Sequence, residues 1–367
     1  GTGVGNTRTS LVLMVAIEGT ERVLVCPLGW GLGHASRVIP IISYLLQKGC
    51  TVTIAGDAQT LSLLQAQFPQ CTSIHFPSIA IKLWKRGRTF ALILIAIKIL
   101  GRTIGEQREL KRIIDEHRIN LVISDNRYGL HSQSIPSVLI THQLQVIFPS
   151  FFKWAETLGR WFIRRHALQF HECWVPDSPS GFRLSGQLSM PKKIPGNVRF
   201  IGLLSRFSDH KKSDTSHPWD LVGIVSGPPP QRAIFERELV NLGNRLSLKT
   251  LIIRGLPQYN SKEIEGLVTL VAHLPDHEMA RVILSAKYII CRSGYSTLMD
   301  LMALERKALL VPTPGQTEQE YLANYLGQQK IFKSCLQNKL STITLNKLND
   351  SQSGKLLQPV VSFFPKC

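Results

Sequence analysis

The chain has 367 residues, of which 44% are hydrophobic and 19% are charged. This length favours two domains over one small core, and the composition excludes an intrinsically disordered protein. The formal net charge is +18, and residues 1–204 carry +12 of it, with 23 Lys and Arg against 11 Asp and Glu. We therefore expect the first half to meet an anionic partner first, and nucleic acid or an anionic membrane surface are the usual classes.

The cysteines argue against a zinc site and against a disulfide framework. They are odd in number and scattered, without a CxxC pair or a mixed Cys and His cluster: Cys26, Cys50, Cys71, Cys173, Cys291, Cys335 and Cys367. We expect buried free thiols in a reducing compartment. No metal site and no cofactor are predicted.

The first 20 residues contain only one short apolar run, Leu11–Ile17. That run is too short for the apolar core of a signal peptide and for a membrane-spanning helix. We expect about the first 20 residues to be a leader or a tag remnant outside the fold.

From Arg22 onward, apolar runs alternate with helical patterns. In the first half we expect a glycine-rich turn at Gly29–Gly33, a helix at His34–Lys48, and strands at Arg22–Pro27, Thr51–Ala55, Asn120–Ser124 and Ser137–Thr141. Strands separated by helices in this rhythm predict parallel βαβ units.

A charged and polar stretch at Ser205–Asp220 has the composition of an interdomain linker, and the rhythm restarts after it. The second half is expected to contain helices from Gln231, at Asp276–Ser285 and at Thr297–Leu304, and strands at Leu221–Val225, Thr250–Ile253, Tyr288–Cys291 and Ala308–Val311. We therefore predict an α/β protein with two Rossmann-like, doubly wound domains facing each other across a cleft. Ligands of such sheets bind outside the carboxyl ends of the strands.

The glycine-rich turn ends at His34 and suits a phosphate or an oxyanion, because Gly31 and Gly33 allow a tight turn that exposes N–H groups. The position of His34 in the first helical turn lowers its pKa and leaves a neutral imidazole able to accept a proton. One alternative is a dinucleotide site with Asp57 as the ribose-binding acid, although the spacing is not GxGxxG. A tight turn without a ligand is the other.

Polar side chains gather after the next two strands of the first half. They are Asp125, Asn126, Tyr128, Thr141, His142 and Gln143. Hydroxyl, amide, imidazole and carboxylate groups together suit a polyol such as a sugar. The acceptor-binding residues that we predict are Gly31, Gly33, Asn126, Tyr128, Thr141, His142 and Gln143. The alternative is that these groups only cap strands and helices.

The second half contains the most specific pattern. Ser226 and Gly227 turn from a strand into a helix, and the segment Arg292–Thr297 opens a helix that carries Asp300. Small and hydroxylic residues at a helix N-terminus can hold a diphosphate, and the Asp300 carboxylate can hold both ribose hydroxyls. A proline-rich turn then leads to Gln319 and Glu320.

The stretch from Arg292 to Asn324 resembles the donor-site signature of glycosyltransferase family 28, the MurG-like enzymes. The glycine loop with His34 is similar to the N-terminal loop of that family. The resemblance implies that Ser293 and Thr297 face the diphosphate, that Asp300 replaces the family's Glu at the ribose, and that Gln319 and Glu320 address the donor sugar. The donor-binding set that we predict is Ser226, Gly227, Arg254, Leu274, Ser293, Gly294, Ser296, Thr297, Asp300, Gln319 and Glu320.

The resemblance implies a GT-B glycosyltransferase with four parts. These are an acceptor-binding domain at 1–204, a linker at 205–220, a nucleotide-sugar domain at 221–335, and a tail at 336–367 that packs back on the first domain. It also implies an inverting, metal-independent transfer from a UDP-sugar to a lipid-linked or other glycan acceptor. A base must take the acceptor proton, and both His34 and Asp125 are candidates.

Two stretches of the first half combine cations with apolar residues. One runs from Lys82 through Phe90–Leu100 to Arg102, and the other from Phe148 to Arg165. We predict that they bind an anionic membrane surface, as in a cytoplasmic protein peripheral on the inner face of the cell membrane. A buried helix is the alternative for each stretch. Nucleic acid is not a predicted partner, because no nucleic-acid-binding motif accompanies the charge.

Two other functions remain open. One is an NAD(P)-dependent oxidoreductase that uses Gly29–Gly33 and Asp57, and it leaves the Arg292–Asn324 pattern unexplained. The other is a non-catalytic sugar- or membrane-binding protein of the same fold.

Overall fold

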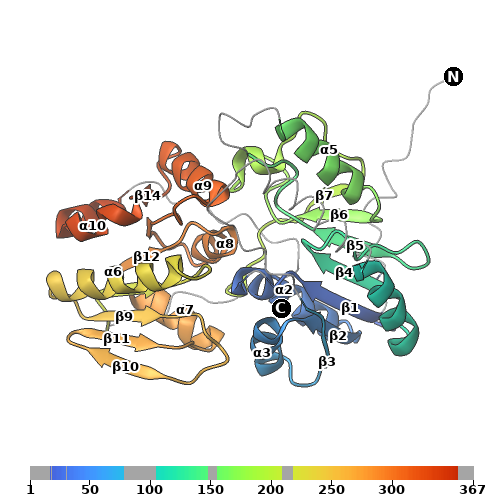
Figure 1. Ribbon diagram of the computed structural model, residues 1–367, viewed down its shortest axis with the longest axis horizontal. Coiled ribbons are helices and arrows are strands. Elements are labelled where there is room, and N and C mark those ends of the chain that lie inside the picture. Colours follow the sequence, from blue (N-terminus) through green and yellow to red (C-terminus); the bar gives the residue numbers. More distant parts are fainter. Residues whose placement is uncertain are drawn as a thin grey trace.

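The structure, a computed structural model, describes residues 17, 19–29, 31–77, 105–147, 155–208 and 218–353. Each half of the described chain forms one seven-stranded sheet with helices on both sides (Figure 1). The two halves lie next to each other, with helices α2 and α8 between the sheets (Figure 1). The predicted α/β class with two Rossmann-like domains is confirmed.

The first sheet has the order β3-β2-β1-β4-β5-β6-β7, and every neighbouring pair is parallel. Its strands are β1 (Arg22–Pro27), β2 (Thr51–Gly56), β3 (Thr72–His75), β4 (Leu121–Asp125), β5 (Ser137–Ile140), β6 (Glu172–Val175) and β7 (Val198–Phe200). The helices of this domain are α2 (Leu32–Gln47), α3 (Ala58–Gln67), residues 105–117, α5 (Ala155–Ala167) and the short 3-10 helix η2 (Gly186–Ser189).

The second sheet has the order β10-β11-β9-β8-β12-β13-β14, and its pairs are parallel except β10 with β11. Its strands are β8 (Leu221–Ile224), β9 (Thr250–Ile253), β10 (Lys262–Glu265), β11 (Val268–Val271), β12 (Tyr288–Cys291), β13 (Leu309–Leu310) and β14 (Lys333–Ser334). The helices are α6 (Gln231–Arg245), α7 (Asp276–Ser285), α8 (Tyr295–Ala303), α9 (Thr317–Gln328), η3 (Gln337–Thr342) and α10 (Leu345–Ser351).

The central strands of both sheets are buried on both faces, which is why they appear in the sequence as uninterrupted apolar runs. Helix α2 buries Val38, Ile42 and Leu45 on one side, at the spacing of an amphipathic helix. It ends at Gln47, and Gly49, which follows the C-cap residue Lys48, has a φ of +88° that is unfavourable for other residues. One apolar cluster includes residues of both domains, so the interface between them is partly a continuous core.

The expectation for the C-terminal tail is wrong for residues 336–353. Leu340, Ile343 and Leu348 pack into the core of the second domain, and the Tyr288 hydroxyl donates to Asn349 Oδ1 at 2.5 Å. The apolar side chains of η3 and α10 cover α6 and β14, and so the described tail completes the second domain. Residues 354–367 lie outside the described residues.

Other differences concern elements with weak sequence signals. The hairpin β10–β11 was not expected, because Lys262–Glu265 is an exposed edge strand without an apolar face.

Ile17 is buried in the core of the first domain, which contradicts a leader that extends to residue 20. The run Phe90–Leu100 with its flanking cations, and Phe148–Trp154, lie outside the described residues.

Among the helices of the described residues, none has the length and hydrophobicity that a membrane span requires.

Candidate functional site

Three charged or titratable side chains meet at the carboxyl ends of β1 and β4. The Nδ1 atom of His34 lies 2.9 Å from Oδ2 of Asp125. Arg37 donates from Nε to the same oxygen at 2.8 Å, and its Nη2 contacts both Asp125 Oδ1 and His34 Nδ1. His34 and Asp125, predicted as alternative bases, therefore form one pair.

The fold explains why these residues meet. Strand β1 pairs with β4 so that Pro27 lies beside Asp125, and His34 follows β1 in the first turn of α2. Arg37 lies three residues after His34 and therefore on the same side of the helix. The site thus results from strand order, which places residues 91 positions apart in contact.

The electrostatics of the pair fit a neutral histidine beside an ionised carboxylate. Burial alone would raise the pKa of Asp125, but Arg37 and His34 lower it below its usual value. Burial lowers the pKa of His34 and Arg37 lowers it further, against the opposing effect of Asp125. Because the His34 side chain keeps 17% exposure while Asp125 keeps none, His34 is the member that a ligand can reach.

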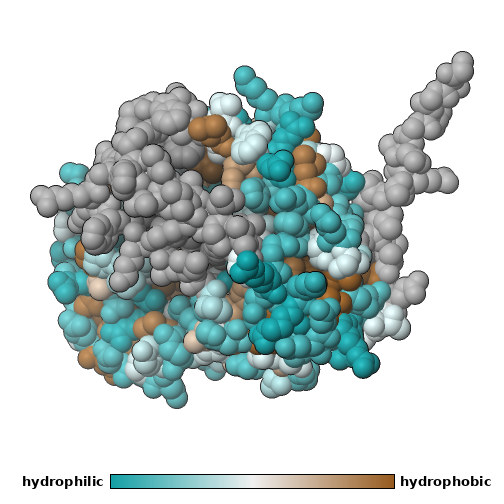
Figure 2. Space-filling view, turned by 45° about the vertical axis from the view of Figure 1, so that its right-hand side comes forward, coloured by the Kyte–Doolittle hydropathy of each residue, from teal (hydrophilic) through white to brown (hydrophobic). Residues whose placement is uncertain are grey.

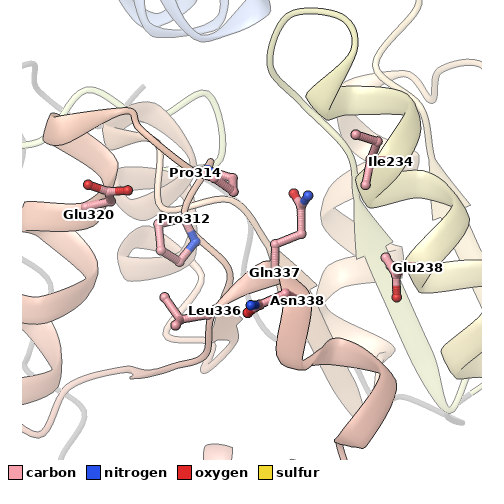
Figure 3. Close-up of a pocket in the computed structure, with 8 residues that line it drawn as sticks. All are labelled: Ile234, Glu238, Pro312, Pro314, Glu320, Leu336, Gln337 and Asn338. Carbon is pink, nitrogen blue, oxygen red and sulfur yellow. The ribbon is translucent and has the colours of Figure 1, made fainter.

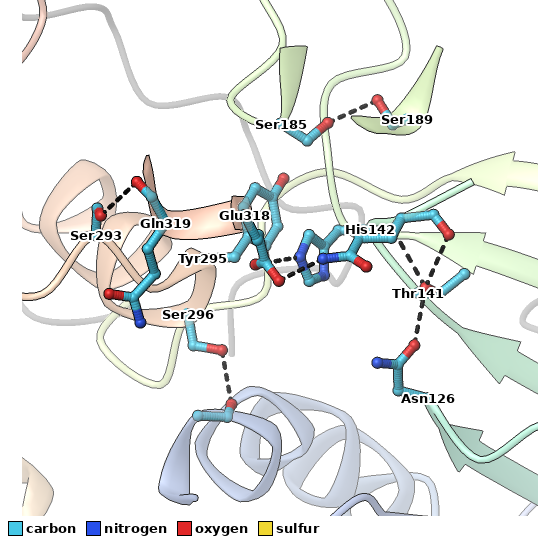
Figure 4. Close-up of polar contacts among 12 residues, drawn as sticks. Asn126, Thr141, His142, Ser185, Ser189, Ser293, Tyr295, Ser296, Glu318 and Gln319 are labelled. Carbon is cyan, nitrogen blue, oxygen red and sulfur yellow. Dashed lines mark hydrogen bonds and ion pairs between the residues drawn. The ribbon is translucent and has the colours of Figure 1, made fainter. Parts of the chain in front are cut away.

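His142 and Gln143, predicted to bind the acceptor, contact the second domain instead. Glu318 on α9 accepts from His142 Nε2 at 2.8 Å and contacts the Gln143 amide through its other oxygen (Figure 4). The His142 ring also stacks on Tyr295 of α8, with centroids 4.2 Å apart and an angle of 3° between the planes. Arg37 links this group to the His34 pair, since its Nη1 lies 3.0 Å from His142 Nδ1.

Asn126, Tyr128 and Thr141, the other predicted acceptor residues, form a cluster just after the carboxyl ends of β4 and β5. The Thr141 hydroxyl donates to Asn126 Oδ1 at 3.0 Å (Figure 4). Asn126 has a φ of +57°, so its backbone turns sharply after β4. Burial raises the pKa of Tyr128 to about 12, and so its phenol stays protonated at neutral pH.

The N-termini of α2 and α8 meet between the domains. The Ser296 hydroxyl donates to the Gly33 carbonyl at 2.7 Å (Figure 4). A Cβ atom on Gly33 would lie 3.2 Å from Ser296 Oγ, and so glycine permits the close approach. At these two described helices, neither N-cap (Gly31 or Gly294) supplies a side-chain hydrogen bond to the first turn, and the N–H groups of a helix N-terminus favour an anion.

Ser293 and Gln319, two predicted donor residues, hold the proline-rich turn to α9. The Ser293 hydroxyl donates to the Gln319 carbonyl at 2.7 Å (Figure 4). The Gln319 amide oxygen accepts from the Thr313 N–H at 2.9 Å. The Glu320 carboxylate accepts from the Gly315 N–H at 2.8 Å. These contacts orient the turn and leave Thr297 partly exposed in the first turn of α8.

Asp300 lies one turn into α8 and contacts the linker. Its two oxygens accept from the Ser205 hydroxyl at 2.6 Å and from Arg206 Nε at 3.3 Å. Arg206 also donates to Asp276 at 2.7 Å. Burial raises the pKa of Asp300 to about 6, despite the opposing effect of Arg206.

The remaining predicted donor residues come from three loops of the second domain. Gly227 has a φ of +100°, so the turn from β8 into α6 that begins at Ser226 requires glycine at this position. Arg254 forms ion pairs with Glu236 and Glu263, and its guanidinium is already neutralised. Leu274 packs against the core and offers backbone groups only.

A cavity of about 460 Å³ lies on the second domain, between α6 and α9 (Figure 3). Its lining residues are Ile234, Glu238, Pro312, Pro314, Glu320, Leu336, Gln337 and Asn338. Glu320, predicted to address the donor sugar, is among them.

Comparison with known proteins decides the family of the second domain. Residues 244–357 match the profile of the glycosyltransferase family 28 C-terminal domain. The second domain belongs to glycosyltransferase family 28.

Longer alignments extend this relationship to both domains. The UDP-N-acetylglucosamine--N-acetylmuramyl-(pentapeptide) pyrophosphoryl-undecaprenol N-acetylglucosamine transferase of Pasteurella multocida (strain Pm70) is 23% identical over 316 residues, which are 84% of this chain and 82% of that protein. The chain is therefore a distant MurG homologue and a MurG-like glycosyltransferase.

Solved structures show the same two-domain GT-B fold. MurG of Acinetobacter baumannii aligns with a TM-score of 0.50 at 18% identity, over 90% of this chain and 89% of that one. The glycosyltransferase SnogD from Streptomyces nogalater aligns with a TM-score of 0.58 at 13% identity, over 91% of both chains.

The structure also bears on the dinucleotide alternative. Asp57, the acid that such a site requires, accepts from the Thr60 N–H at 2.9 Å and caps α3. Its carboxylate therefore has a structural role in this glycosyltransferase.

Sequence reasoning missed three charged residues of the site. Arg37 could have been predicted from the sequence, because it lies three positions after His34 and therefore on the same side of the predicted helix. Glu318 and Arg206 had none, since their partners belong to the other domain or to a distant segment.

Proposed function

We propose that this MurG-like protein is an inverting glycosyltransferase that moves a hexose or N-acetylhexosamine from a UDP-sugar to a lipid-linked or other glycan acceptor. The observation that carries the proposal is the His34–Asp125 pair, which lies beside the contact between α2 and α8. A base on the first domain thus faces the donor motif on the second.

The geometry supports His34 as the general base. The ionised Asp125 carboxylate accepts a hydrogen bond from Nδ1–H of His34, and this tautomer leaves a lone pair on Nε2. Arg37 Nη2 keeps Asp125 Oδ1 as its acceptor in this state. Nε2 then removes the proton of the acceptor hydroxyl as that oxygen attacks the anomeric carbon and the bond to UDP breaks.

Attack from the face opposite to the leaving diphosphate inverts the anomeric carbon. The open helix N-termini of α8 and α2, with the hydroxyls of Ser293, Ser296 and Thr297 close to α8, would stabilise the charge on the diphosphate. The sequence contains no Asp-x-Asp motif, and we propose that these groups act without a metal.

Donor recognition would require the Asp300 carboxylate to exchange some of its present hydrogen-bond partners for the donor. This carboxylate would hold the ribose hydroxyls, and one of its present contacts with Ser205 and Arg206 would then be shared or released. The backbone around Leu274 would contact the base, and Gln319 and Glu320 would contact the sugar.

Helix α5 supports the proposed membrane contact on the cytoplasmic side. Its outer face exposes Leu158 (60%) and Trp161 (62%), with Arg164 and Arg165 beside them and Leu168 just beyond the helix end. An apolar stripe flanked by cations is typical of helices that lie in a membrane interface. On the face shown in Figure 2, the described surface is mostly hydrophilic, with separate hydrophobic areas.

Calorimetry with UDP tests the proposal. We expect binding by the wild type and a loss of about 1–3 kcal/mol in Asp300→Ala, because the ribose hydroxyls lose their acceptor. Tyr325→Phe, which removes the hydroxyl that donates to the Arg183 carbonyl of the first domain, serves as the control. Absence of UDP binding by the wild type, or equal affinity in the two variants, would contradict this assignment of the donor site.

A further inference from the structure

Glu318 reaches from the second domain into the polar cluster of the first. Helix α9 begins at Thr317, so Glu318 lies in its first turn. Its carboxylate contacts both His142 and Gln143, which follow β5 (Figure 4). No donor- or acceptor-binding role was predicted for Glu318 from the sequence.

The hydrogen-bond partners of His142 define its tautomer. Arg37 can only donate, and its Nη1 lies 3.0 Å from His142 Nδ1. Unlike His34 Nδ1, which also lies beside the Asp125 carboxylate, this nitrogen is therefore an acceptor. The ring proton is on Nε2 and is donated to Glu318. Glu318 thus holds His142 in the state that accepts from Arg37, and Arg37 in turn holds Asp125, the partner of His34.

The charges of the cluster balance only after proton transfer. With His34 neutral, one cation, Arg37, lies among two anions, Asp125 and Glu318. When His34 accepts the acceptor proton, two cations face two anions. Without Glu318 the protonated His34 would leave an excess positive charge in a largely buried site, which is costly.

We propose that Glu318 is a positioning residue for the His34 base, and that it supplies from the second domain the charge that compensates the protonated imidazole. This inference rests on the proposed role of His34. Because Glu318 and His142 belong to different domains, the base is fully supported only while the two domains are in contact. Glu318 directly precedes Gln319 and Glu320, so donor binding near α9 would be coupled to the base.

The direction of the pKa shift at Glu318 agrees with this role. Burial alone would raise its pKa, but His142, His34 and Arg37 lower it below the usual value. The groups that shift the pKa of His34 are Asp125 on β4, Arg37 on α2 and His142 after β5, and His34 in turn acts on Glu318 of α9. Of the two anions, Glu318 is the one supplied by the second domain.

Titration of His34 by NMR tests the proposal without a substrate. The imidazole Cε1–H signal of His34, assigned by its loss in His34→Gln, is followed against pH in the full chain. We expect Glu318→Gln, which keeps size and hydrogen bonding but removes the charge, to lower the titration midpoint. Glu318→Asp, which keeps the charge, should restore the midpoint toward the wild-type value.

Tyr325→Phe is the matched control. Tyr325 also lies on α9 and donates across the domain interface to the Arg183 carbonyl at 2.9 Å, but it carries no charge. An unchanged midpoint in Tyr325→Phe together with a lower one in Glu318→Gln supports the proposal. An unchanged midpoint in Glu318→Gln, or equal shifts in both variants, overturns it.

A kinetic readout adds a second criterion. Once a donor and an acceptor support turnover, Glu318→Gln should lower kcat about 10-fold, within the usual range of coupling between sites, and should move the acidic limb of the pH profile to lower pH. Loss of packing alone would not move that limb. Failure of UDP binding would count against the proposed function only, because the titration of His34 needs no ligand.

Discussion

Asp125 determines both the tautomer and the basicity of His34. Asp125→Asn removes the negative charge that favours Nδ1–H, and the amide presents donors toward Arg37 as well as an acceptor. We therefore expect kcat to fall by about 10²–10⁴, the usual size of a general-base contribution.

Two measurements separate this effect from simple unfolding. Arg37 is buried, so the variant also loses stability, and turnover must be measured below its melting temperature. UDP affinity should stay close to the wild-type value, because Asp125 belongs to the first domain. Wild-type turnover in Asp125→Asn would remove the carboxylate from the mechanism.

Asp300 should make stability depend on pH. Burial raises its pKa from 3.8 to about 6, so the folded state holds this proton more tightly than the unfolded state. Its contribution to stability is complete below pH 4 and is lost as pH rises through about 6, an effect of about 2–3 kcal/mol. Asp300→Asn cannot titrate and should gain this amount relative to the wild type between pH 4 and pH 7.

Urea unfolding at several pH values measures this difference directly. The variant keeps an acceptor for Ser205, and Arg206 keeps Asp276, so the comparison isolates the ionisation of Asp300. A stability difference that does not change with pH would show that the Asp300 pKa is not raised.

At the scale of elements, α5 is expected to attach the protein to anionic membranes. Apolar side chains that insert into the interface should make binding partly resistant to salt, whereas the attraction of Arg164 and Arg165 should weaken with salt. In flotation with anionic vesicles, Leu158→Ser with Trp161→Ser should therefore reduce the salt-resistant fraction.

The hairpin β10–β11 supplies a control on the other domain. Ile264 is 71% exposed on an edge strand, and Ile264→Ser should leave flotation unchanged. Equal recovery of the wild type with and without anionic vesicles would contradict a membrane role for α5.

Glycine at position 31 is expected to matter for the entry into α2. Its φ of +88° is strained for other residues, and nothing within 4 Å of a Cβ atom there would clash. Gly31→Ala should therefore cost about 1–3 kcal/mol through backbone strain alone, measured by urea unfolding. Gly105→Ala, at a position with open space and no positive φ, is the matched comparison and should be close to neutral.

At the scale of the molecule, the sequence predicts the strands and helices better than their contacts. The expected strand Arg22–Pro27 coincides with β1, because a buried parallel strand is an uninterrupted apolar run with a clear end. Strands with mixed composition, such as β10, give no such signal. The tail was misplaced because apolar residues such as Leu340 and Leu348 show that a segment is buried but not against which domain.

The candidate site shows the same limit. Sequence motifs identified His34 and Asp125 separately, as alternative bases. The pairing of β1 with β4 brings them together, and local sequence patterns do not reveal which strands pair. The contact of Glu318 with His142 further depends on how two domains pack. Such contacts follow from tertiary structure, and only their residue types are visible beforehand.

The central claim is that His34 takes the acceptor proton in transfer from a UDP-sugar. The most direct test measures release of UDP from a panel of UDP-sugars in the presence of a membrane lipid extract as acceptor, for the wild type and for His34→Ala. The account predicts acceptor-dependent release by the wild type and about 10²–10⁴-fold slower release by His34→Ala, with equal affinity for UDP in calorimetry. Equal rates of release for the two proteins would contradict it.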